Sequence, residues 1–215
     1  MTRHVPQHLN AAPKRPVILL TGFGPFPGMP ENISGPLVAA LAVEAARAFP
    51  QFDVRFEILP TEWALAPLRV TELIKAFAPV LSLHFGVAKS ATDIRFESCA
   101  ANLCRAAHDA AGLEPLSNSL VSNGEDVHAA TIPISAVYQK LAANGFPVSI
   151  SDDAGGYLCN AVLYHSVLEN NRQGALRMSG FIHLPADLNS PPLTFSVALN
   201  ACLQVIGGCL AVEPV

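Results

Sequence analysis

The sequence lacks both a long apolar run and an excess of positive charge. Its longest apolar runs, such as 17–20 and 80–83, are far shorter than the ~20 residues that a membrane-spanning helix needs. The first 14 residues contain no apolar stretch of the kind that a secretory signal has. A net charge of -4 gives none of the basic footprint that nucleic-acid-binding proteins usually show. We therefore expect a cytoplasmic protein that binds neither membranes nor nucleic acids.

Paired cysteines and metal-ligand motifs are also missing. The five cysteines are an odd set, and their spacing with histidine matches no zinc site. A reduced, intracellular chain with a free thiol is the simplest interpretation. Segment 22–28, Gly-Phe-Gly-Pro-Phe-Pro-Gly, is a poor phosphate-binding loop, because its third glycine comes one place late and two prolines remove N–H groups. The sequence therefore favours neither a metal site nor a nucleotide site.

What is present is a chain long and apolar enough for one folded domain. It has 215 residues, of which 51% are hydrophobic and 14% charged, a composition typical of a globular domain with a large core. Residues 1–15 are rich in polar residues and are expected to form a flexible N-terminal segment. Residues 16–215 contain no linker and no internal repeat, so they are expected to form a single α/β domain.

Apolar runs bounded by glycine or proline alternate with segments of helical period. The predicted strands are 16–23, 53–59, 79–86, 93–98, 146–150 and 180–184. The predicted helices begin at Ser34, Thr61, Ile134, Gly156 and Pro192. Such alternation predicts βαβ units, and hence a mainly parallel central sheet with helices on both faces. The stretch from 90 to 128 contains one of these strands and then a long, irregular excursion.

The helical period also predicts which side chains face the core. Ser34 is expected to cap its helix, with an inward face of Leu37, Val38, Leu41 and Ala45. The helix over 61–78 is expected to bury Leu65, Leu68, Leu73 and Phe77. Strand 53–59 alternates in a way that predicts an inward Val54, Phe56 and Ile58.

Three segments with reactive side chains follow or end predicted strands, where sites lie in open α/β sheets. In the first, Ser151–Asn160, two glycines allow a tight turn and place Cys159 in the first turn of a helix. The dipole and free N–H groups of a helix N-terminus stabilise a thiolate and an oxyanion. Cys159 is therefore a candidate nucleophile. The alternative is a small buried residue at a helix start.

The other two segments supply a base and a carboxylate. His183 ends an apolar strand before Pro185, and an imidazole there can take a thiol proton and later protonate a leaving amine. His84 ends another apolar strand and competes for this role. Glu97 lies among apolar neighbours and needs a partner, which a histidine ring N–H would supply. A salt bridge from Glu97 to a nearby arginine is the alternative.

Four segments of the chain carry a family resemblance. They are, in order, Leu20–Phe26, Phe96–Ser98 with Ala101–Asn102, Ala154–Asn160 and Gly180–Pro185. Together they resemble pyroglutamyl peptidase type I, a family of cytosolic cysteine exopeptidases, over roughly residues 17–185. The resemblance implies a three-layer α/β/α sandwich with a mainly parallel central sheet. It also implies a homo-oligomer, a dimer or a tetramer, without a metal or an organic cofactor.

The resemblance further implies an activity and a set of site residues. The substrate would be an N-terminally blocked peptide, and the amide bond after its pyroglutamyl residue would be hydrolysed through a thioester on Cys159. Glu97, Cys159 and His183 match the catalytic positions of the family. The implied substrate-binding residues are Phe23, Phe26, Asn32, Val87, Tyr157 and Leu158. The two phenylalanines would grip the pyroglutamyl ring.

The chain departs from the family pattern near the expected pocket. Ser98 follows Glu97 where the family usually has arginine, and Val87 lies where the family tends to have glutamine. These changes spare the three catalytic positions. They leave two alternatives open: a cysteine amidase of the same fold that acts on another small acyl group or lactam, and a catalytically inactive small-molecule binder. An ordinary, unactivated thiol would indicate the binder.

Overall fold

The protein folds around a six-stranded sheet with the strand order β2-β1-β3-β8-β4-β7. The computed structural model describes residues 15–174 and 177–211, so nearly all of the predicted N-terminal segment lies outside the described residues. The strands are β1 (Val17–Phe23), β2 (Asp53–Leu59), β3 (Leu81–Ala88), β4 (Ile94–Glu97), β7 (Val148–Ser151) and β8 (Met178–Pro185). They agree with the predicted strands to within about two residues at each end.

The strands of the sheet are mainly but not all parallel. β2, β1, β3 and β8 run in one direction, whereas β4 pairs with β8 in antiparallel fashion and β7 follows β4. The three reactive segments therefore do not all leave the sheet at one edge, as a wholly parallel sheet would require. β4 begins at the end of the sheet where β8 stops and runs the other way, so Glu97, its last residue, lies opposite Phe181, two positions before His183.

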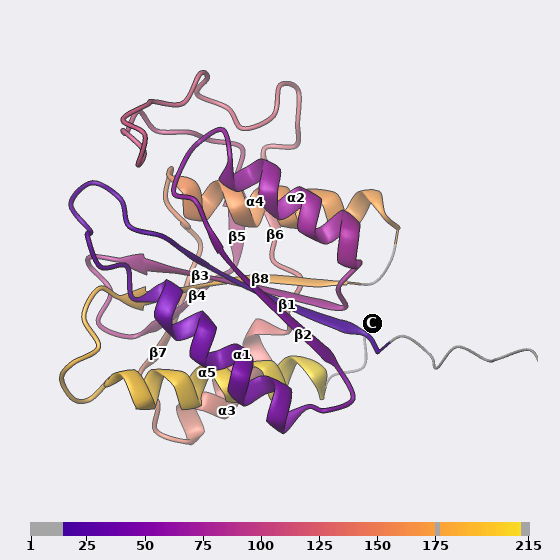
Figure 1. Ribbon diagram of the computed structural model, residues 1–215, viewed down its shortest axis with the longest axis vertical. Helices are drawn as coiled ribbons and strands as arrows, with labels where there is room; N and C mark the ends of the chain where they lie inside the picture. The colour runs from indigo at the N-terminus through magenta and orange to yellow at the C-terminus, as the bar shows by residue number, and fades with distance from the viewer. Residues whose placement is uncertain (1–14, 175–176, 212–215) are drawn as a thin grey trace, which may run out of the picture.

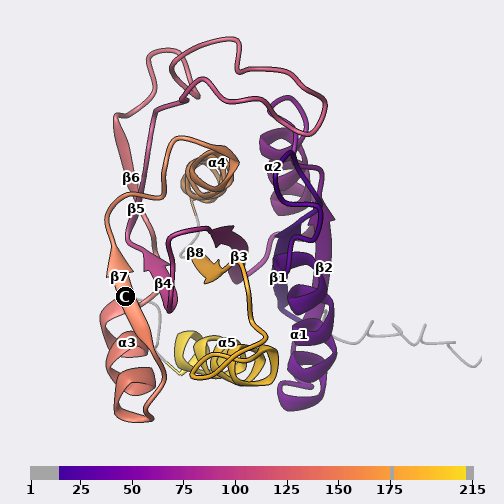
Figure 2. The ribbon, with the colours of Figure 1, turned by 90° about the vertical axis from the view of Figure 1, so that its left-hand side faces the viewer.

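Helices cover both faces of this sheet, which gives the predicted three layers (Figures 1 and 2). The helices are α1 (Ser34–Ala48), α2 (Ala66–Phe77), α3 (Ile134–Ala143), α4 (Leu158–Arg172) and α5 (Phe195–Leu210). α1, α3 and α5 lie on one face, and α2 and α4 on the other. An apolar core lies on each face of the sheet. On one face, Leu81, Leu83 and Phe85 of β3 point towards α1 and α5.

The face of the sheet beneath α4 is more polar at its centre. Because side chains alternate along a strand, the residues of β3 that directly follow Leu81, Leu83 and Phe85 point towards α4. These are Ser82, His84 and Gly86. On neighbouring strands Thr21, Ser179 and His183 are also buried. The apolar core on this side lies around these polar residues. This polar centre under α4 is where the reactive side chains meet.

Two predicted details of the helices are wrong. Ser34 makes no capping bond to α1; instead its hydroxyl accepts a hydrogen bond from Phe23 N (3.0 Å) and bonds to Asn32. It ties the end of β1 to the start of α1. In α2, only Leu73 of the four predicted inward residues is buried, and the buried face is Ala66, Val70, Leu73 and Ile74. The helix begins at Ala66, later than predicted, so the first turn counted from Thr61 has no helical period.

The edge strand β2 also differs from its predicted alternation. Phe56 and Ile58 are 48% and 40% exposed, although the pattern predicts that they point inward. Arg55 and Glu57 on the opposite side pack against α2, where Glu57 accepts two hydrogen bonds from Arg69. Val43 of α1 is 50% exposed as well. Apolar side chains are therefore open to solvent along this edge of the described chain.

The irregular excursion is more ordered than its sequence predicts. After β4 the chain forms β5 (Cys99–Ala101), which pairs with β6 (Val127–Ala129) as a separate two-stranded ribbon. The segment between these strands, 102–126, arches over the amino-terminal ends of α2 and α4 (Figure 2). Asn102 pins it with paired hydrogen bonds to the backbone of Val121 (2.8 and 2.9 Å).

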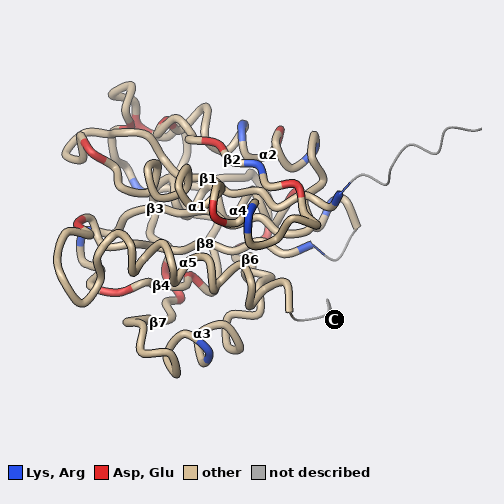
Figure 3. The backbone as a smooth tube through the Cα atoms, turned by 60° about the horizontal axis from the view of Figure 1, so that its bottom comes forward, with Lys and Arg blue, Asp and Glu red and all other residues tan. Residues whose placement is uncertain are grey.

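Charged residues of both signs are interspersed along the described parts of the chain (Figure 3). In the same residues, 15–174 and 177–211, no helix is both long and apolar enough to cross a membrane.

Candidate active site

The order of the strands creates an opening between β1 and β3. The chain proceeds from β1 outwards to β2 and then returns past β1 to β3, so this is the switch point at which ligands bind in open α/β sheets. The β1–β3 ladder ends at Thr21 and His84, whereas the β3–β8 ladder continues to Ala88 and Pro185. The last residues of β3 therefore have one edge that β1 does not cover.

Cys159 reaches this region from the start of α4. The loop after β7 turns at Gly155, whose φ of +81° is a conformation that favours glycine. Asp153 supports the turn by accepting a hydrogen bond from Gly155 N (2.9 Å). Cys159 is the second residue of α4 and is half-buried. Its backbone N–H precedes the first bond within the helix, from Ala161 N to Tyr157 O (3.1 Å), so it is free for a ligand.

Gly86 allows the sulfur of Cys159 to lie against the sheet. A Cβ atom on Gly86 would be 2.8 Å from Cys159 Sγ and 2.8 Å from the ring of Phe181, which is closer than such atoms approach. Gly86 lies opposite His183 in the β3–β8 register. The missing side chain on β3 is therefore what allows the thiol to lie next to His183.

His183 connects the thiol to Glu97. Its Nδ1 donates a hydrogen bond to Glu97 Oε1 at 2.6 Å, and both side chains are buried. Burial by itself lowers the pKa of His183, but the charges and hydrogen bonds of Cys159 and Glu97 outweigh it and raise this pKa above its usual value. The alternative, a salt bridge from Glu97 to an arginine, is not formed, since Arg95 and Arg105 lie next to Asp93 and Asp153 instead. The three predicted catalytic residues thus lie in one connected group.

The competing histidine, His84, lies away from this group. It is fully buried, with Nδ1 2.8 Å from the hydroxyl of Thr21 and Nε2 2.8 Å from that of Ser166. Burial lowers its pKa to about 3, so it is neutral at physiological pH. It shares no bond with Cys159 or Glu97.

A small cavity opens directly beside Cys159. It is lined by Phe23, Phe26, Asn32, Thr61, Val87, Tyr157, Leu158 and Cys159. All six predicted substrate-binding residues are among these. Phe26 and Tyr157 face one another with ring centroids 6.0 Å apart. The cavity is thus mainly aromatic and aliphatic, and it lies at the opening between β1 and β3.

The polar side chains of this cavity are already engaged. Asn32 and Thr61 both donate to Gly24 O, at 3.1 and 2.9 Å. The hydroxyl of Tyr157 donates to His108 O at 3.2 Å. A ligand in the cavity therefore meets mainly apolar side chains and the uncovered backbone edge of β3.

Thr61 and Gly86 are two residues of the site that sequence reasoning did not assign to it. Thr61 was expected to begin a helix, and its place in the loop before α2 is visible only in the fold. Gly86 belongs to a segment that differs from the family pattern, but its close approach to a cysteine 73 positions later has no local signal. Asn160 and Asn102, which belong to the segments that carry the family resemblance, bind backbone groups of β5 and of the excursion.

The excursion forms the outer wall next to this cavity. Asp109 is buried and accepts hydrogen bonds from the backbone of Trp63, Ala111 and Leu113, each at 2.9 Å. Burial raises the pKa of this carboxyl, but these three N–H groups and that of Asp109 itself overcome the effect and lower it. Trp63 in turn lies edge-on to Tyr157, with ring centroids 5.1 Å apart.

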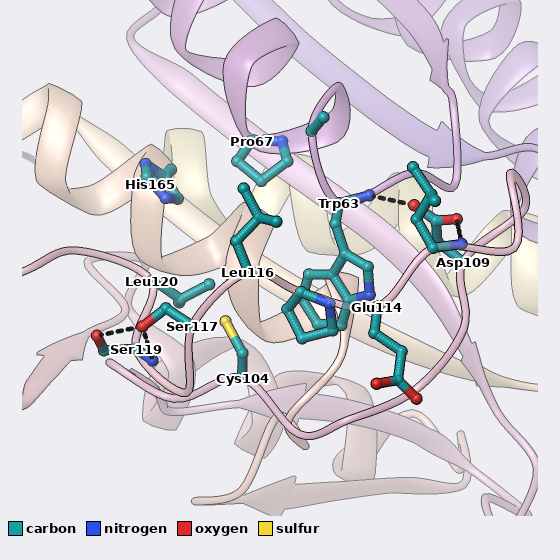
Figure 4. A pocket seen from close by; sticks show the side chains of 13 residues that line it. Trp63, Pro67, Cys104, Asp109, Glu114, Leu116, Ser117, Ser119, Leu120 and His165 are labelled. Atoms are coloured by element: carbon teal, nitrogen blue, oxygen red, sulfur yellow. Dashed lines mark hydrogen bonds between the residues drawn. The ribbon is translucent and has the colours of Figure 1, made fainter.

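A second cavity, of about 390 Å³, lies on the far side of Trp63, between the excursion and helices α2 and α4 (Figure 4). Its walls are mainly apolar, with Leu116 and Leu120 on one side and Pro67 and His165 on the other. Within the described ranges, no cluster of three or more His, Cys, Asp or Glu side chains is arranged to hold a metal ion.

A thiol at a helix start, next to a histidine that bonds to a buried carboxylate, is an arrangement suited to nucleophilic catalysis by cysteine. The sequence model of the family described as "Pyroglutamyl peptidase" matches residues 16–191. The chain belongs to this family.

Several relatives and solved structures support this membership. The chain is 32% identical to a pyrrolidone-carboxylate peptidase of Oceanobacillus iheyensis, over 90% of this chain and 98% of the relative. It is 33% identical to one of Chromobacterium violaceum, over 91% and 90% of the two chains. Among solved structures, pyroglutamyl peptidase I of Bacillus amyloliquefaciens superposes with a TM-score of 0.83 at 26% identity, covering 92% of this chain and 98% of that one. A mutant pyrrolidone carboxyl peptidase of Pyrococcus furiosus gives the same TM-score and identity, covering 91% and 98%.

Proposed function

We propose that this protein is a cysteine exopeptidase that removes an N-terminal pyroglutamyl residue from peptides, with Cys159 as nucleophile, His183 as base and Glu97 as its orienting carboxylate. The observation that carries the proposal is the aromatic cavity that begins at Cys159 and lies at the switch point of the sheet. A cavity of this kind binds a small acyl group and leaves the scissile bond at the thiol.

The cavity suits a neutral lactam. Phe23, Phe26 and Tyr157 offer apolar faces to a five-membered ring, and a ring of this kind brings no charge that would need a buried counter-ion. The lactam N–H needs an acceptor and the lactam carbonyl needs a donor. The uncovered edge of β3 near Val87 supplies backbone groups of both kinds. Because the backbone makes these bonds, a valine at position 87, where the family tends to have glutamine, is compatible with pyroglutamyl recognition.

Acylation begins with transfer of the thiol proton from Cys159 to His183. The sulfur attacks the carbonyl carbon of the pyroglutamyl residue, and the carbonyl oxygen becomes an oxyanion bonded to first-turn N–H groups of α4. When the intermediate collapses, the C–N bond breaks and His183 gives its proton to the leaving amine. The shortened peptide departs, and a thioester remains on Cys159.

Deacylation repeats these steps with water. His183 takes a proton from water as the hydroxide adds to the thioester; the C–S bond then breaks, His183 returns the proton to the sulfur, and pyroglutamate is released. Glu97 accepts a hydrogen bond from Nδ1 throughout and stabilises the imidazolium that forms in each half-reaction. The raised pKa of His183 makes its imidazole a better acceptor for the proton of the Cys159 thiol.

We also propose that the protein works in the cytoplasm as a homo-oligomer, a dimer or a tetramer. The exposed apolar residues Phe56 and Ile58 of the edge strand β2, and Val43 of α1, support self-association. Light scattering of the purified protein would measure the mass, and a monomer at micromolar concentration would contradict this proposal.

A panel of fluorogenic amides that share one leaving amine tests the specificity. We expect turnover of the pyroglutamyl amide, and a kcat/KM at least about a hundredfold lower for the prolyl and glutaminyl amides, since each lacks part of the lactam's hydrogen bonding or shape. Equal rates for the prolyl amide would indicate a broader amidase. No turnover of any amide, with an unreactive Cys159, would indicate a binder.

A further inference from the structure

A chain of buried hydrogen bonds connects three strands and α4 at some distance from the catalytic group. It begins with Thr21 on β1, passes through the ring of His84 on β3, and reaches Ser166 on α4, each contact being 2.8 Å long. From Ser166 it continues to Ser179 on β8 at 2.9 Å. These four residues have no solvent exposure. The proposed reaction uses none of them.

This chain of hydrogen bonds uses the same face of α4 as Cys159 and the face of β3 against which Cys159 packs. Ser166 follows Cys159 by seven positions, close to two turns, so both project from the same side of α4. His84 precedes Gly86 by two positions, so both face the same side of β3. α4 therefore contacts β3 at two points: Cys159 Sγ against Gly86, and Ser166 Oγ against His84.

We propose that His84 and Ser166 are positioning residues that fix the register of α4 along β3 and thereby hold Cys159 beside His183. The inference rests on the proposed function of Cys159. Neither residue touches the substrate or the reacting atoms, and both act through the position of the helix.

Directional bonds suit this task better than the apolar contacts around them. Val162, Leu163 and Val167 bind α4 to the core, but apolar contacts are non-directional and tolerate small shifts. A hydrogen bond requires an angle near linear and a distance within a few tenths of an ångström. A neutral imidazole has one donor and one acceptor, which matches the two hydroxyls on either side of it.

The same chain ties α4 to the strand of the base. Ser179 is on β8, four residues before His183, and it also accepts a hydrogen bond from Asn170 of α4 (2.6 Å). α4 is thus bonded to β3, which carries Gly86, and to β8, which carries His183. The relative placement of nucleophile and base is set by bonds outside the active site.

Ser166→Ala tests the proposal, with Ser82→Ala as the matched control. Ser82 is an equally buried serine on the same face of β3, but its hydroxyl has no hydrogen-bond partner among the described residues. Ser166→Ala removes two buried hydrogen bonds, to His84 and to Ser179, and we expect it to lower kcat for the pyroglutamyl amide about tenfold. KM is expected to stay within about twofold, because the cavity residues are unchanged. Ser82→Ala is expected to match the wild type.

Alkylation of Cys159 by iodoacetamide, followed by peptide mapping, reads the position of the thiol without any substrate. We expect Ser166→Ala to slow this alkylation and Ser166→Thr, which keeps the hydroxyl, to restore both rates. Thr21→Val keeps the side-chain shape and removes the other hydroxyl that holds His84, so it serves as a second variant if Ser166→Ala does not fold. It is expected to lower kcat about threefold.

Wild-type kcat and alkylation in Ser166→Ala, or in Thr21→Val, would overturn the proposal. An equal loss in Ser82→Ala would overturn it too, since general loosening would then explain the effect. A wild type that alkylates rapidly at Cys159 but cleaves no pyroglutamyl amide would contradict the proposed function alone, and the alkylation rates of the variants would still test the positioning.

Discussion

Two buried histidines lie on neighbouring strands of the same sheet and face the same helix, yet they have opposite electrostatic surroundings. His84 of β3 meets only hydroxyl groups, and burial lowers its pKa to about 3. His183 of β8 is almost as deeply buried, but it lies between Cys159 and the carboxylate of Glu97, and its pKa is raised. The difference comes from the partners of the ring and not from its depth.

The comparison separates two functions that one residue type can have under one helix. The charged pair around His183 is suited to moving protons, because a nearby anion stabilises each protonated intermediate. The neutral ring of His84 is suited to holding elements in place, because it keeps one donor and one acceptor over a wide pH range. The same polar centre beneath α4 thus serves both chemistry and alignment.

The largest expected effect comes from removing the anion that defines the surroundings of His183. Glu97→Gln keeps the shape and one acceptor but loses the charge, so the imidazolium is less stable and less well oriented. We expect kcat to fall by about a hundredfold to a thousandfold, with KM changed only a few-fold. Steady-state kinetics with the pyroglutamyl amide measures both.

Glu169→Gln is the matched control for this variant. Glu169 is also a buried carboxylate, 4% exposed, but it lies at the far end of α4 near Lys75 and Arg172. We expect near wild-type kcat for it. Full activity in Glu97→Gln would remove Glu97 from the catalytic group.

A smaller loss of activity is expected when a methyl group is added to β3 at Gly86, beneath Cys159. In Gly86→Ala the new Cβ would meet Cys159 Sγ and the Phe181 ring, each at 2.8 Å, so the sulfur must move away from His183. Misplacement of a reacting atom by about 1 Å costs on the order of a hundredfold in rate. Gly207→Ala in α5 is the control, since its Cβ would meet its nearest neighbour at 3.4 Å. A fully active Gly86→Ala enzyme would show that close packing of the thiol on β3 is unnecessary.

The smallest expected effect is on the pH dependence of the free energy of unfolding, to which the two histidines contribute with opposite sign. Below about pH 6.5 the unfolded chain protonates His84 but the folded protein does not, so stability falls as the pH drops towards the lowered pKa. The expected loss from this group is about 1.4 kcal/mol per pH unit. His183 acts in the opposite range: its folded-state pKa is raised, so its contribution is complete below about pH 6.5 and is lost as the pH rises above it.

Urea unfolding of wild type and His84→Gln at about pH 6.5 and about pH 5 measures the His84 contribution. We expect the acid-side loss in the variant to be smaller by about 2 kcal/mol. His108→Gln, at an exposed histidine, controls for the substitution itself. Equal pH dependence in wild type and His84→Gln would contradict the neutral, buried assignment.

Much of the fold was predictable from the sequence, because apolar runs and helical periods are local signals. The strands, the helix 134–143 and the mainly parallel sheet with helices on both faces follow from them. The direction of β4 did not, since antiparallel pairing at the far side of the sheet depends on partners that are distant in sequence. The exposed Phe56 lies on the edge strand β2, where alternation alone does not decide burial. The exposed Leu68 was mispredicted because α2 begins at Ala66 and buries another face.

The candidate site was predictable in its residue types but not in its geometry. The motifs around Cys159 and His183 indicate the family, and all the predicted pocket residues line one cavity. His84 and His183 look alike in sequence, each ending an apolar strand, and only the fold reveals their different partners. The approach of Cys159 to Gly86 and the bond from His84 to Ser166 join distant segments, so no local pattern predicts them.

The most direct test of the catalytic assignment compares wild type with Cys159→Ala on the pyroglutamyl amide, with circular dichroism to check that both are folded. The account predicts turnover in the wild type and none in the variant, because the substitution removes the nucleophile and leaves the fold intact. Undiminished turnover in folded Cys159→Ala would contradict it.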